Sequence, residues 1–239
     1  MSEVLQNIGI TLKKFIFKHK YFLISFIVLA IIGRIFGREI DIPISSLFYN
    51  EDGFFLRNSI FAEVIQYGVH FFMAIFLSII VLMFIYTLIT KKSLFKINRK
   101  AFLFIIVTFI LAPGLVANLL LKENVGRPRP VSITEFAGDK IFQPPFKISN
   151  ECSSNCSFVS GHSASMFTLM LFGFFFRGRT RKIVFSATFL IGVITSIGRI
   201  IQGRHFFTDT VFAFFFVWLT INLVYEFMYK SDDLPESLK

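Results

Sequence analysis

Two histidines stand beside polar and basic residues in a chain that is otherwise strongly apolar. Ser160, Gly161 and His162 directly precede one apolar run, and His205 and Asp209, four residues apart, precede another. Four-residue spacing places two side chains on one face of a helix. A neutral imidazole can attack phosphorus when a carboxylate holds its other nitrogen, and a second imidazole can protonate the departing oxygen. The sequence therefore predicts phosphoryl transfer, with His205 as nucleophile, Asp209 as its orienting partner and His162 as general acid and then base.

Five basic residues accompany these histidines: Lys122, Arg127, Arg129, Arg199 and Arg204. Ionisable groups are costly at membrane depth, and they persist there when they pair with one another or perform chemistry. Because Asp209 and a few loop acids cannot neutralise five cations, the cluster predicts an anionic ligand, and guanidinium groups suit phosphate oxygens. Ser160 and the Gly161 amide, near a predicted helix start, add further phosphate donors.

The composition predicts a membrane protein whose helices position these groups. The 239 residues are 54% hydrophobic and include 35 Phe, and the mean hydropathy is +0.68, outside the usual range of soluble domains. Runs of roughly 20 apolar residues can cross the hydrocarbon core of a bilayer. We expect an all-α, single polytopic domain over residues 1–239, with six transmembrane helices at 20–37, 66–90, 101–121, 160–176, 183–201 and 210–229.

The distribution of Lys and Arg predicts how these helices are oriented. Thirteen of the 25 basic residues fall in 13–20, 91–100 and 177–182, and positively charged short loops are retained on the cytoplasmic side. Both termini are therefore expected in the cytoplasm, and the 122–158 loop is expected outside with the active site. The segment 40–64 suits an interfacial helix or a plain connecting loop. The net charge of +10 arises mostly from juxtamembrane clusters that bind anionic lipids, so nucleic acid is not an expected partner.

The remaining polar residues leave alternatives open. Cys152 and Cys156 lie in the outer loop and form either a disulfide or two free thiols. Arg127 and Arg204 either contact a second phosphate of the ligand or extend to lipid head groups, and His70 is assigned to packing within a span. Four histidines without ligand spacing disfavour a metal-dependent oxidase, and no metal or cofactor is expected. An anion transporter is the alternative class, but the sequence has no broken apolar segments in matching halves.

Three short segments carry most of the candidate residues. KENVGRPRP (122–130) has the spacing K-x6-RP, VSGH (159–162) is one residue from PSGH, and GRIIQGRHFFTD (198–209) has R-x5-H-x3-D after a glycine. Together they resemble the signature of the type 2 phosphatidic acid phosphatase superfamily, which contains membrane lipid phosphatases and vanadium-type haloperoxidases. The chain departs from that signature at Val159, where the family has proline, and at Gly198, where it has serine. These departures affect turn stiffness and one hydroxyl contact.

The resemblance implies a six-helix membrane fold and metal-free hydrolysis of a lipid phosphate ester. It implies that His205 forms a phosphohistidine and that the phosphoryl oxygens are bound by a common set: Lys122, Arg129, Arg199, Ser160 and the Gly161 amide. The stretch CSSNCSFVSGH (152–162) resembles the lipid A phosphatase branch, which implies an enzyme of the bacterial inner membrane with a periplasmic active site.

Within that branch, a lipid A 1-phosphatase is the favoured expectation. The alternatives are a lipid A 4′-phosphatase, or an undecaprenyl diphosphate or phosphatidylglycerophosphate phosphatase. The sequence leaves open whether water or another lipid takes the phosphoryl group, and it leaves the oligomeric state open.

Overall fold

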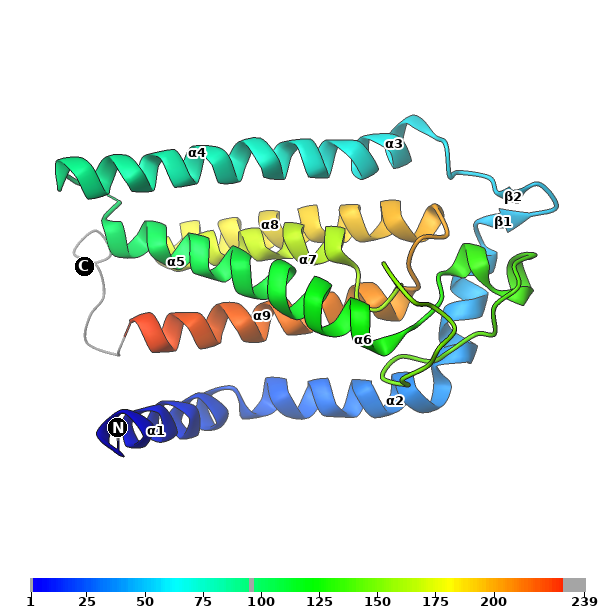
Figure 1. The fold of residues 1–239 in the computed structure, drawn as a ribbon, viewed down its shortest axis with the longest axis horizontal. Coiled ribbons are helices and arrows are strands. Elements are labelled where there is room, and N and C mark those ends of the chain that lie inside the picture. Colours follow the sequence, from blue (N-terminus) through cyan, green and yellow to red (C-terminus); the bar gives the residue numbers. More distant parts are fainter. Residues whose placement is uncertain (1, 95–96, 230–239) are drawn as a thin grey trace.

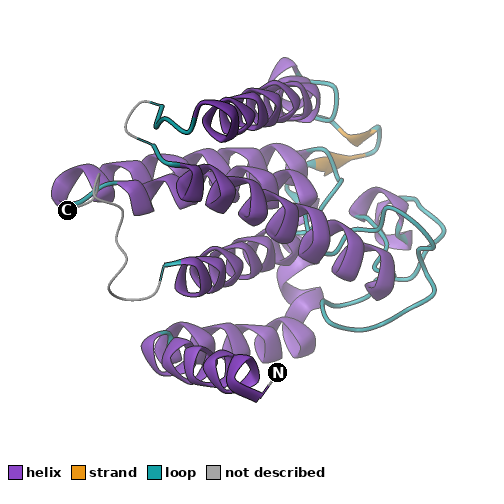
Figure 2. Ribbon diagram, turned by 60° about the vertical axis from the view of Figure 1, so that its left-hand side comes forward, coloured by secondary structure: helices purple, strands orange, loops and turns teal. Residues whose placement is uncertain are grey.

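A bundle of long helices forms the body of the protein, and irregular segments cover one end of it (Figure 1). This computed structural model describes residues 2–94 and 97–229. Its helices are α1 (Ser2–Lys18), α2 (Lys20–Ser46), α3 (Ile60–Glu63), η1 (Val64–Gly68), α4 (Val69–Thr90), α5 (Arg99–Phe109), η2 (Ile110–Lys122), α6 (Glu123–Val125), η3 (Pro130–Ser132), η4 (Thr134–Phe136), α7 (Gly161–Thr168), η5 (Leu169–Phe175), α8 (Gly178–Ile201) and α9 (Phe207–Met228). The strands β1 (Tyr49–Asn50) and β2 (Gly53–Phe54) form a short antiparallel hairpin at the covered end (Figure 2).

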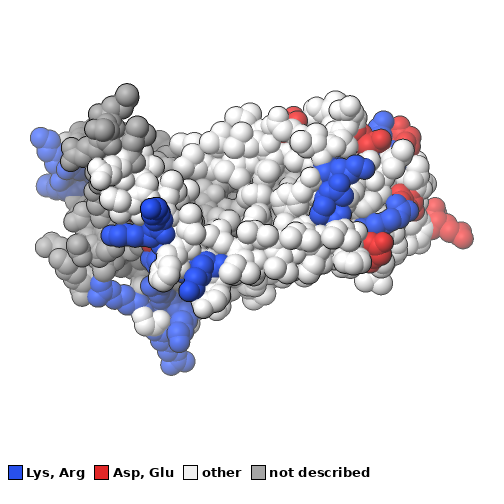
Figure 3. All heavy atoms as spheres, turned by 90° about the horizontal axis from the view of Figure 1, so that it is seen from below, with Lys and Arg blue, Asp and Glu red and all other residues white. Residues whose placement is uncertain are grey.

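The long helices have the length and composition of membrane spans. Among the described residues, five segments are long and apolar enough: Lys20–Ser46, Ile60–Thr90, Arg99–Ser132, Gly178–Ile201 and Phe207–Met228. The apolar segment Gly161–Phe175 is shorter. In Figure 3, Lys and Arg gather toward the two ends of the face shown, and the surface between them is largely uncharged. The helical, multi-pass membrane fold is confirmed, whereas six crossings and two cytoplasmic termini stay predictions, and residues 230–239 lie outside the described part.

Two regions near the N-terminus differ from expectation. The sequence predicted a basic cluster at 13–20 and no helix before residue 20, but the structure has the separate helix α1 before the first span. Helix α2 does not end at residue 37; it kinks at Phe36 and continues through Pro43 to Ser46. An interfacial helix over 40–64 is therefore wrong, because the first part of that segment extends α2 and the hairpin follows. The extension is held in place by Asp41, which is buried against Arg127.

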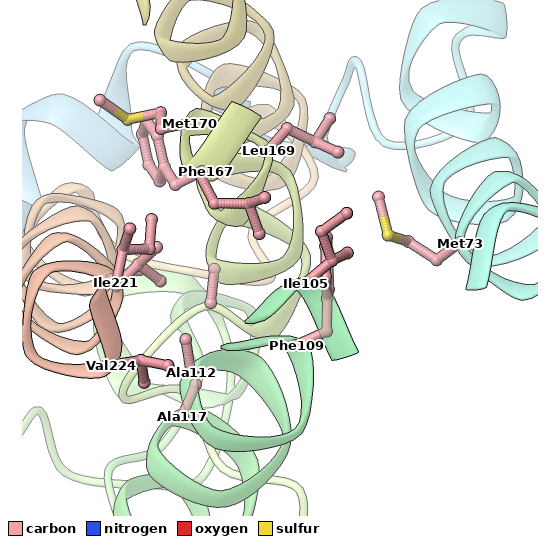
Figure 4. Packing of buried hydrophobic residues seen from close by; sticks show 14 of the residues in the cluster. Met73, Ile105, Phe109, Ala112, Ala117, Phe167, Leu169, Met170, Ile221 and Val224 are labelled. Atoms are coloured by element: carbon pink, nitrogen blue, oxygen red, sulfur yellow. The ribbon is translucent and has the colours of Figure 1, made fainter. Parts of the chain in front are cut away.

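Helix α7 lies inside the bundle, where it packs against α8, α9 and η2. Packing between helices in lipid depends on close van der Waals contact and on small residues at the interface. Gly192 of α8 meets this need, since a Cβ there would lie 2.2 Å from the Phe167 ring of α7. Figure 4 shows another helix contact made through a small residue, with Val224 of α9 beside Ala112 of η2. This packing fixes the starts of α7 and α9, which carry the two candidate histidine segments.

Gly126 connects η2 and α6 to the active-site loop in a conformation that requires glycine. Its φ is +68°, and a Cβ there would lie 1.8 Å from the carbonyl oxygen of Ser149. We expect Gly126→Ala to lower the midpoint of thermal unfolding in detergent, because the clash adds to the roughly 1 kcal/mol cost of left-handed backbone. Gly9→Ala is the matched control, since a Cβ there meets nothing within 4 Å. An unchanged midpoint for Gly126→Ala would contradict this account of the turn.

Candidate active site

His205 lies in the turn between α8 and α9 and is only 1% exposed. The turn forms because the Arg204 and His205 amides both donate to the carbonyl of Arg199, at 3.1 and 3.3 Å. His205 Nδ1 is 2.8 Å from the backbone carbonyl oxygen of Ser157. Because a carbonyl oxygen can only accept, Nδ1 carries the proton and Nε2 keeps its lone pair. The geometry leaves Nε2 as the ring nitrogen with a free lone pair.

Asp209 supports His205 from the first turn of α9, mainly through other groups. Asp209 Oδ2 accepts a hydrogen bond from the Phe206 amide at 2.8 Å and another from the Ser157 hydroxyl. The same oxygen is 3.7 Å from His205 Nδ1, which is beyond hydrogen-bond length. Asp209 therefore fixes Ser157, whose carbonyl orients His205, and a carboxylate this close would stabilise positive charge on the imidazole. His205 and Asp209 lie close together, as their spacing predicted, but the Ser157 carbonyl rather than Asp209 accepts the hydrogen bond from His205 Nδ1.

Burial lowers the pKa of His205 to about 3, although Asp209 opposes this shift. The imidazole is therefore neutral at physiological pH, as a nucleophile must be. In the unfolded chain it binds a proton near pH 6.5, so the unfolded state holds more protons than the folded state between about pH 6.5 and 3, and stability falls as the pH falls. We expect the unfolding midpoint to drop less between about pH 7 and about pH 5 in His205→Asn than in the wild type. Equal drops would contradict the neutral, buried state of His205.

His162 occupies the first turn of α7, which Ser160 caps. The Ser160 hydroxyl accepts from the Ser163 amide at 3.3 Å and from the Ser163 hydroxyl at 2.8 Å. Ser160 is fully buried and does not line the cavity described below, so its hydroxyl serves as a helix cap here, and the predicted phosphate contact of Ser160 stays a prediction. Gly161 does line the cavity, and a Cβ there would lie 2.7 Å from Asn118 Oδ1 and 3.5 Å from Lys122 Nζ. Glycine at 161 therefore lets a ligand approach the start of the helix.

The two histidines open into one cavity of about 570 Å³ at the covered end of the bundle. The sequence-predicted residues that line it are Lys122, Arg129, Gly161, His162, Arg199, Arg204 and His205. Arg199 Nη1 donates to Gln202 at 2.5 Å, while its Nε is buried without a hydrogen-bond partner among the described residues. Leaving a buried guanidinium nitrogen unpaired is costly, and a phosphate oxygen would satisfy it. The cavity thus brings the imidazoles of His205 and His162 together with four cations.

Arg129 is held by the loop that the two cysteines close. Its Nη2 donates to Asn155 Oδ1 and to the Asn155 carbonyl, both at 2.8 Å. Asn155 lies within the Cys152–Cys156 disulfide loop, and it also lines the cavity. Of the two states that the sequence left open for these cysteines, the structure contains the disulfide. The bridge therefore stiffens the segment that places Arg129 at the cavity.

Arg127 is not a contact for a second phosphate, and it does not extend to head groups. It is fully buried, it forms ion pairs with Asp209 and Asp41, and its Nε donates to the Gln143 carbonyl at 2.7 Å. Thr208, at the start of α9, binds both Arg127 and Asp41. The prediction for Arg127 is wrong because two buried carboxylates take its charge, whereas Arg204 does line the cavity.

Several cavity residues were not predicted: Gln66, Val69, His70, Met73, Asn118, Asn155 and Ser165. His70 was assigned to packing within a span, but its ring stacks on His162 with the centroids 4.4 Å apart. The backbone carbonyl oxygen of Gln66 accepts a hydrogen bond from His162 Nε2, and its side-chain Oε1 accepts one from Arg199 Nη1. The sequence offered one sign of these two residues: Gln66 and His70 are four positions apart at the start of an apolar run. That spacing does not indicate which residues they contact.

Comparison with known proteins agrees with this arrangement. Residues 100–233 match the PAP2 superfamily. The chain is 41% identical over 200 residues to a lipid A 4′-phosphatase of Francisella tularensis subsp. novicida (strain U112), covering 82% of this chain and 89% of the relative. A lipid A 4′-phosphatase of Rhizobium leguminosarum is 34% identical over 118 residues, or 49% of each chain.

A solved structure gives the same fold. The crystal structure of a transmembrane PAP2 type phosphatidylglycerolphosphate phosphatase from Bacillus subtilis aligns with a TM-score of 0.61 at 23% identity, covering 90% of this chain and 97% of that one. The fold agrees with the family match and the 41% identical relative, which identify the chain as a member of the PAP2 superfamily, a multi-pass membrane phosphatase that acts on a lipid phosphate.

Proposed function

We propose that this protein removes the 4′-phosphate of lipid A. The observation that carries the chemistry is the joint placement of His205, His162 and four cations around one cavity. The choice of position rests on the relatives, because the 41% and 34% identical proteins are both lipid A 4′-phosphatases. The sequence-based preference for the 1-phosphate has no such support, so its stated alternative becomes the proposal.

The reaction follows from the two imidazoles. His205 Nε2 attacks phosphorus, a P–N bond forms, and the P–O bond to the sugar breaks while His162 gives its proton to the departing oxygen. Lys122, Arg129 and Arg199 bind the phosphoryl oxygens and stabilise the charge that develops on them. His162, now neutral, takes a proton from water, which attacks the phosphohistidine and releases inorganic phosphate. The positive imidazole of the intermediate is stabilised by the charge of Asp209.

The proposed location is the inner membrane of a bacterium, with the cavity at the periplasmic face. The concentration of Lys and Arg in 13–20, 91–100 and 177–182 supports a cytoplasmic position for the opposite end. The Cys152–Cys156 disulfide beside the cavity supports an oxidising compartment, since disulfides persist outside the cytosol. A lipid in the outer leaflet would then present its phosphate directly to the cavity.

The deciding experiment incubates the purified protein in detergent and EDTA with bis-phosphorylated lipid A. Released phosphate is quantified, and mass spectrometry locates the phosphate that remains. We expect stoichiometric release with the 1-phosphate retained and no requirement for added metal. Retention of the 4′-phosphate would instead establish the 1-phosphatase, and transfer of phosphate to a second lipid would establish a phosphotransferase. Activity confined to a prenyl diphosphate or to phosphatidylglycerophosphate would overturn the lipid A assignment, and binding without turnover would favour the anion transporter.

A further inference from the structure

One wall of the cavity comes from the helix that begins before α4, outside residues 100–233 that match the superfamily. Gln66 in η1 and His70 in α4 lie on this wall, four residues apart. Both contact His162, which is 96 positions from Gln66. This wall therefore touches the predicted general acid directly, although neither residue belongs to the signature segments.

The backbone carbonyl of Gln66 determines which nitrogen of His162 is free to transfer a proton. His162 Nε2 lies 3.2 Å from this carbonyl oxygen, and because the oxygen can only accept, Nε2 must carry a proton. Nδ1 has no hydrogen-bond partner among the described residues, so it is the nitrogen that can gain and lose a proton during turnover. Segment Val64–Gly68 is a π-helical turn, and such turns are frequent at functional sites.

His70 contributes contact without a proton path. The two rings are stacked, with an interplanar angle of 23° and a centroid distance of 4.4 Å. The N–H bonds of an imidazole lie in the plane of the ring, so a near-parallel neighbour cannot pass a proton across the stack. The stack instead restricts tilt of the His162 ring, while the Gln66 carbonyl restricts its rotation.

We propose that His70 is a positioning residue that, with the Gln66 carbonyl, holds the His162 ring so that Nδ1 faces the departing oxygen. In the step it serves, the P–O bond breaks as the P–N bond to His205 forms, and the Nδ1 proton moves to the oxygen that leaves. His162 is then neutral and accepts a proton from water through the same Nδ1. The inference rests on the proposed hydrolysis of a lipid phosphate ester, but not on which phosphate of lipid A is removed.

The test compares His70→Phe, His70→Leu and His70→Ala, with Phe71→Ala as the matched control. Phe71 neighbours His70 on α4, is 70% exposed and does not line the cavity. Positioning by ring stacking predicts that kcat falls about tenfold in the Leu and Ala variants, with KM within about twofold. Phenylalanine keeps a flat ring and removes only the nitrogens, so His70→Phe should stay within about threefold of the wild-type kcat, as should the control. Thermal unfolding midpoints are measured for every variant.

Three results would overturn this proposal. A wild-type kcat in His70→Ala would show that the stack does not matter. A kcat in His70→Phe as low as in His70→Ala would show that the nitrogens of His70, rather than its ring, are needed. A change confined to KM would make His70 a substrate contact. All variants are assayed on lipid A and on phosphatidylglycerophosphate, so a wild type active only on the second substrate contradicts the lipid A proposal and still tests His70.

Discussion

His205→Ala is expected to abolish phosphate release, with a loss of at least about 10³-fold in kcat, because it removes the residue proposed to form the covalent intermediate. His162 also lines the cavity, but its proposed role is proton transfer through Nδ1. Phosphate release from a radiolabelled lipid measures the loss. Brief incubation followed by denaturation in alkali, in which phosphohistidine survives, measures whether label stays on the protein.

Retention of label tests directly whether His205 carries the phosphoryl group. The wild type should retain label during turnover, and His205→Ala should retain none. His19→Ala is the matched control, since His19 lies between α1 and α2 and does not line the cavity, and it should release phosphate at the wild-type rate. If His205→Ala still incorporated label, the nucleophile would be a different residue and the reaction order proposed above would fail.

For this part of the site, local spacing in the sequence was enough to predict which residues lie close together. His205 and Asp209 are separated by one helical turn, and Gly161 and His162 begin a helix, so their neighbourhoods follow from a few consecutive residues. The cations Lys122, Arg129 and Arg199 were predicted from their place at the ends of apolar runs. All three line the cavity in the structure.

Long-range contacts were beyond the reach of spacing. His70 lies near the start of an apolar run and reads as packing, because nothing in the sequence places it 4.4 Å from a ring that is 92 positions away. The segment 40–64 failed for a related reason. Its mixture of apolar and charged residues suited an interfacial position, but the charged residue Asp41 is fully buried against Arg127. A charge at membrane depth can mark a buried partner as well as water.

Arg127 shows this ambiguity most clearly, and its replacement is the second large expected effect. It lies two residues from Arg129, yet Arg129 reaches the cavity while Arg127 neutralises Asp41 and Asp209. Arg127→Met keeps much of the side-chain volume but leaves two buried carboxylates unpaired. Breaking a buried pair in this way costs about 3–5 kcal/mol. We expect a clearly lower unfolding midpoint, and a loss of kcat of about 10²-fold or more in the protein that remains folded.

The loss of activity follows from the order of contacts. Asp209 binds the Ser157 hydroxyl, the Ser157 carbonyl binds His205 Nδ1, and Arg127 holds Asp209 from the other side. A displaced Asp209 would therefore release the ring that must attack phosphorus. Asp41→Asn keeps the shape of the side chain and removes one of the two carboxylate charges that pair with Arg127. It should therefore lower kcat less than Arg127→Met does.

Arg38→Met provides the matched control, because Arg38 is also a cation paired with a carboxylate, Glu135, but its side chain is 57% exposed. Exposed pairs contribute about 0–1 kcal/mol, so the midpoint and the kcat of this variant should stay near wild-type values. If Arg127→Met resembled Arg38→Met in both measurements, the buried network would not position His205. If Arg127→Met lost stability while the folded fraction kept full kcat, the network would brace α2 against α9 without acting on the nucleophile. If the network both stabilises the fold and positions His205, Arg127→Met must lose stability and kcat together, because Asp209 pairs with Arg127 and also supports His205.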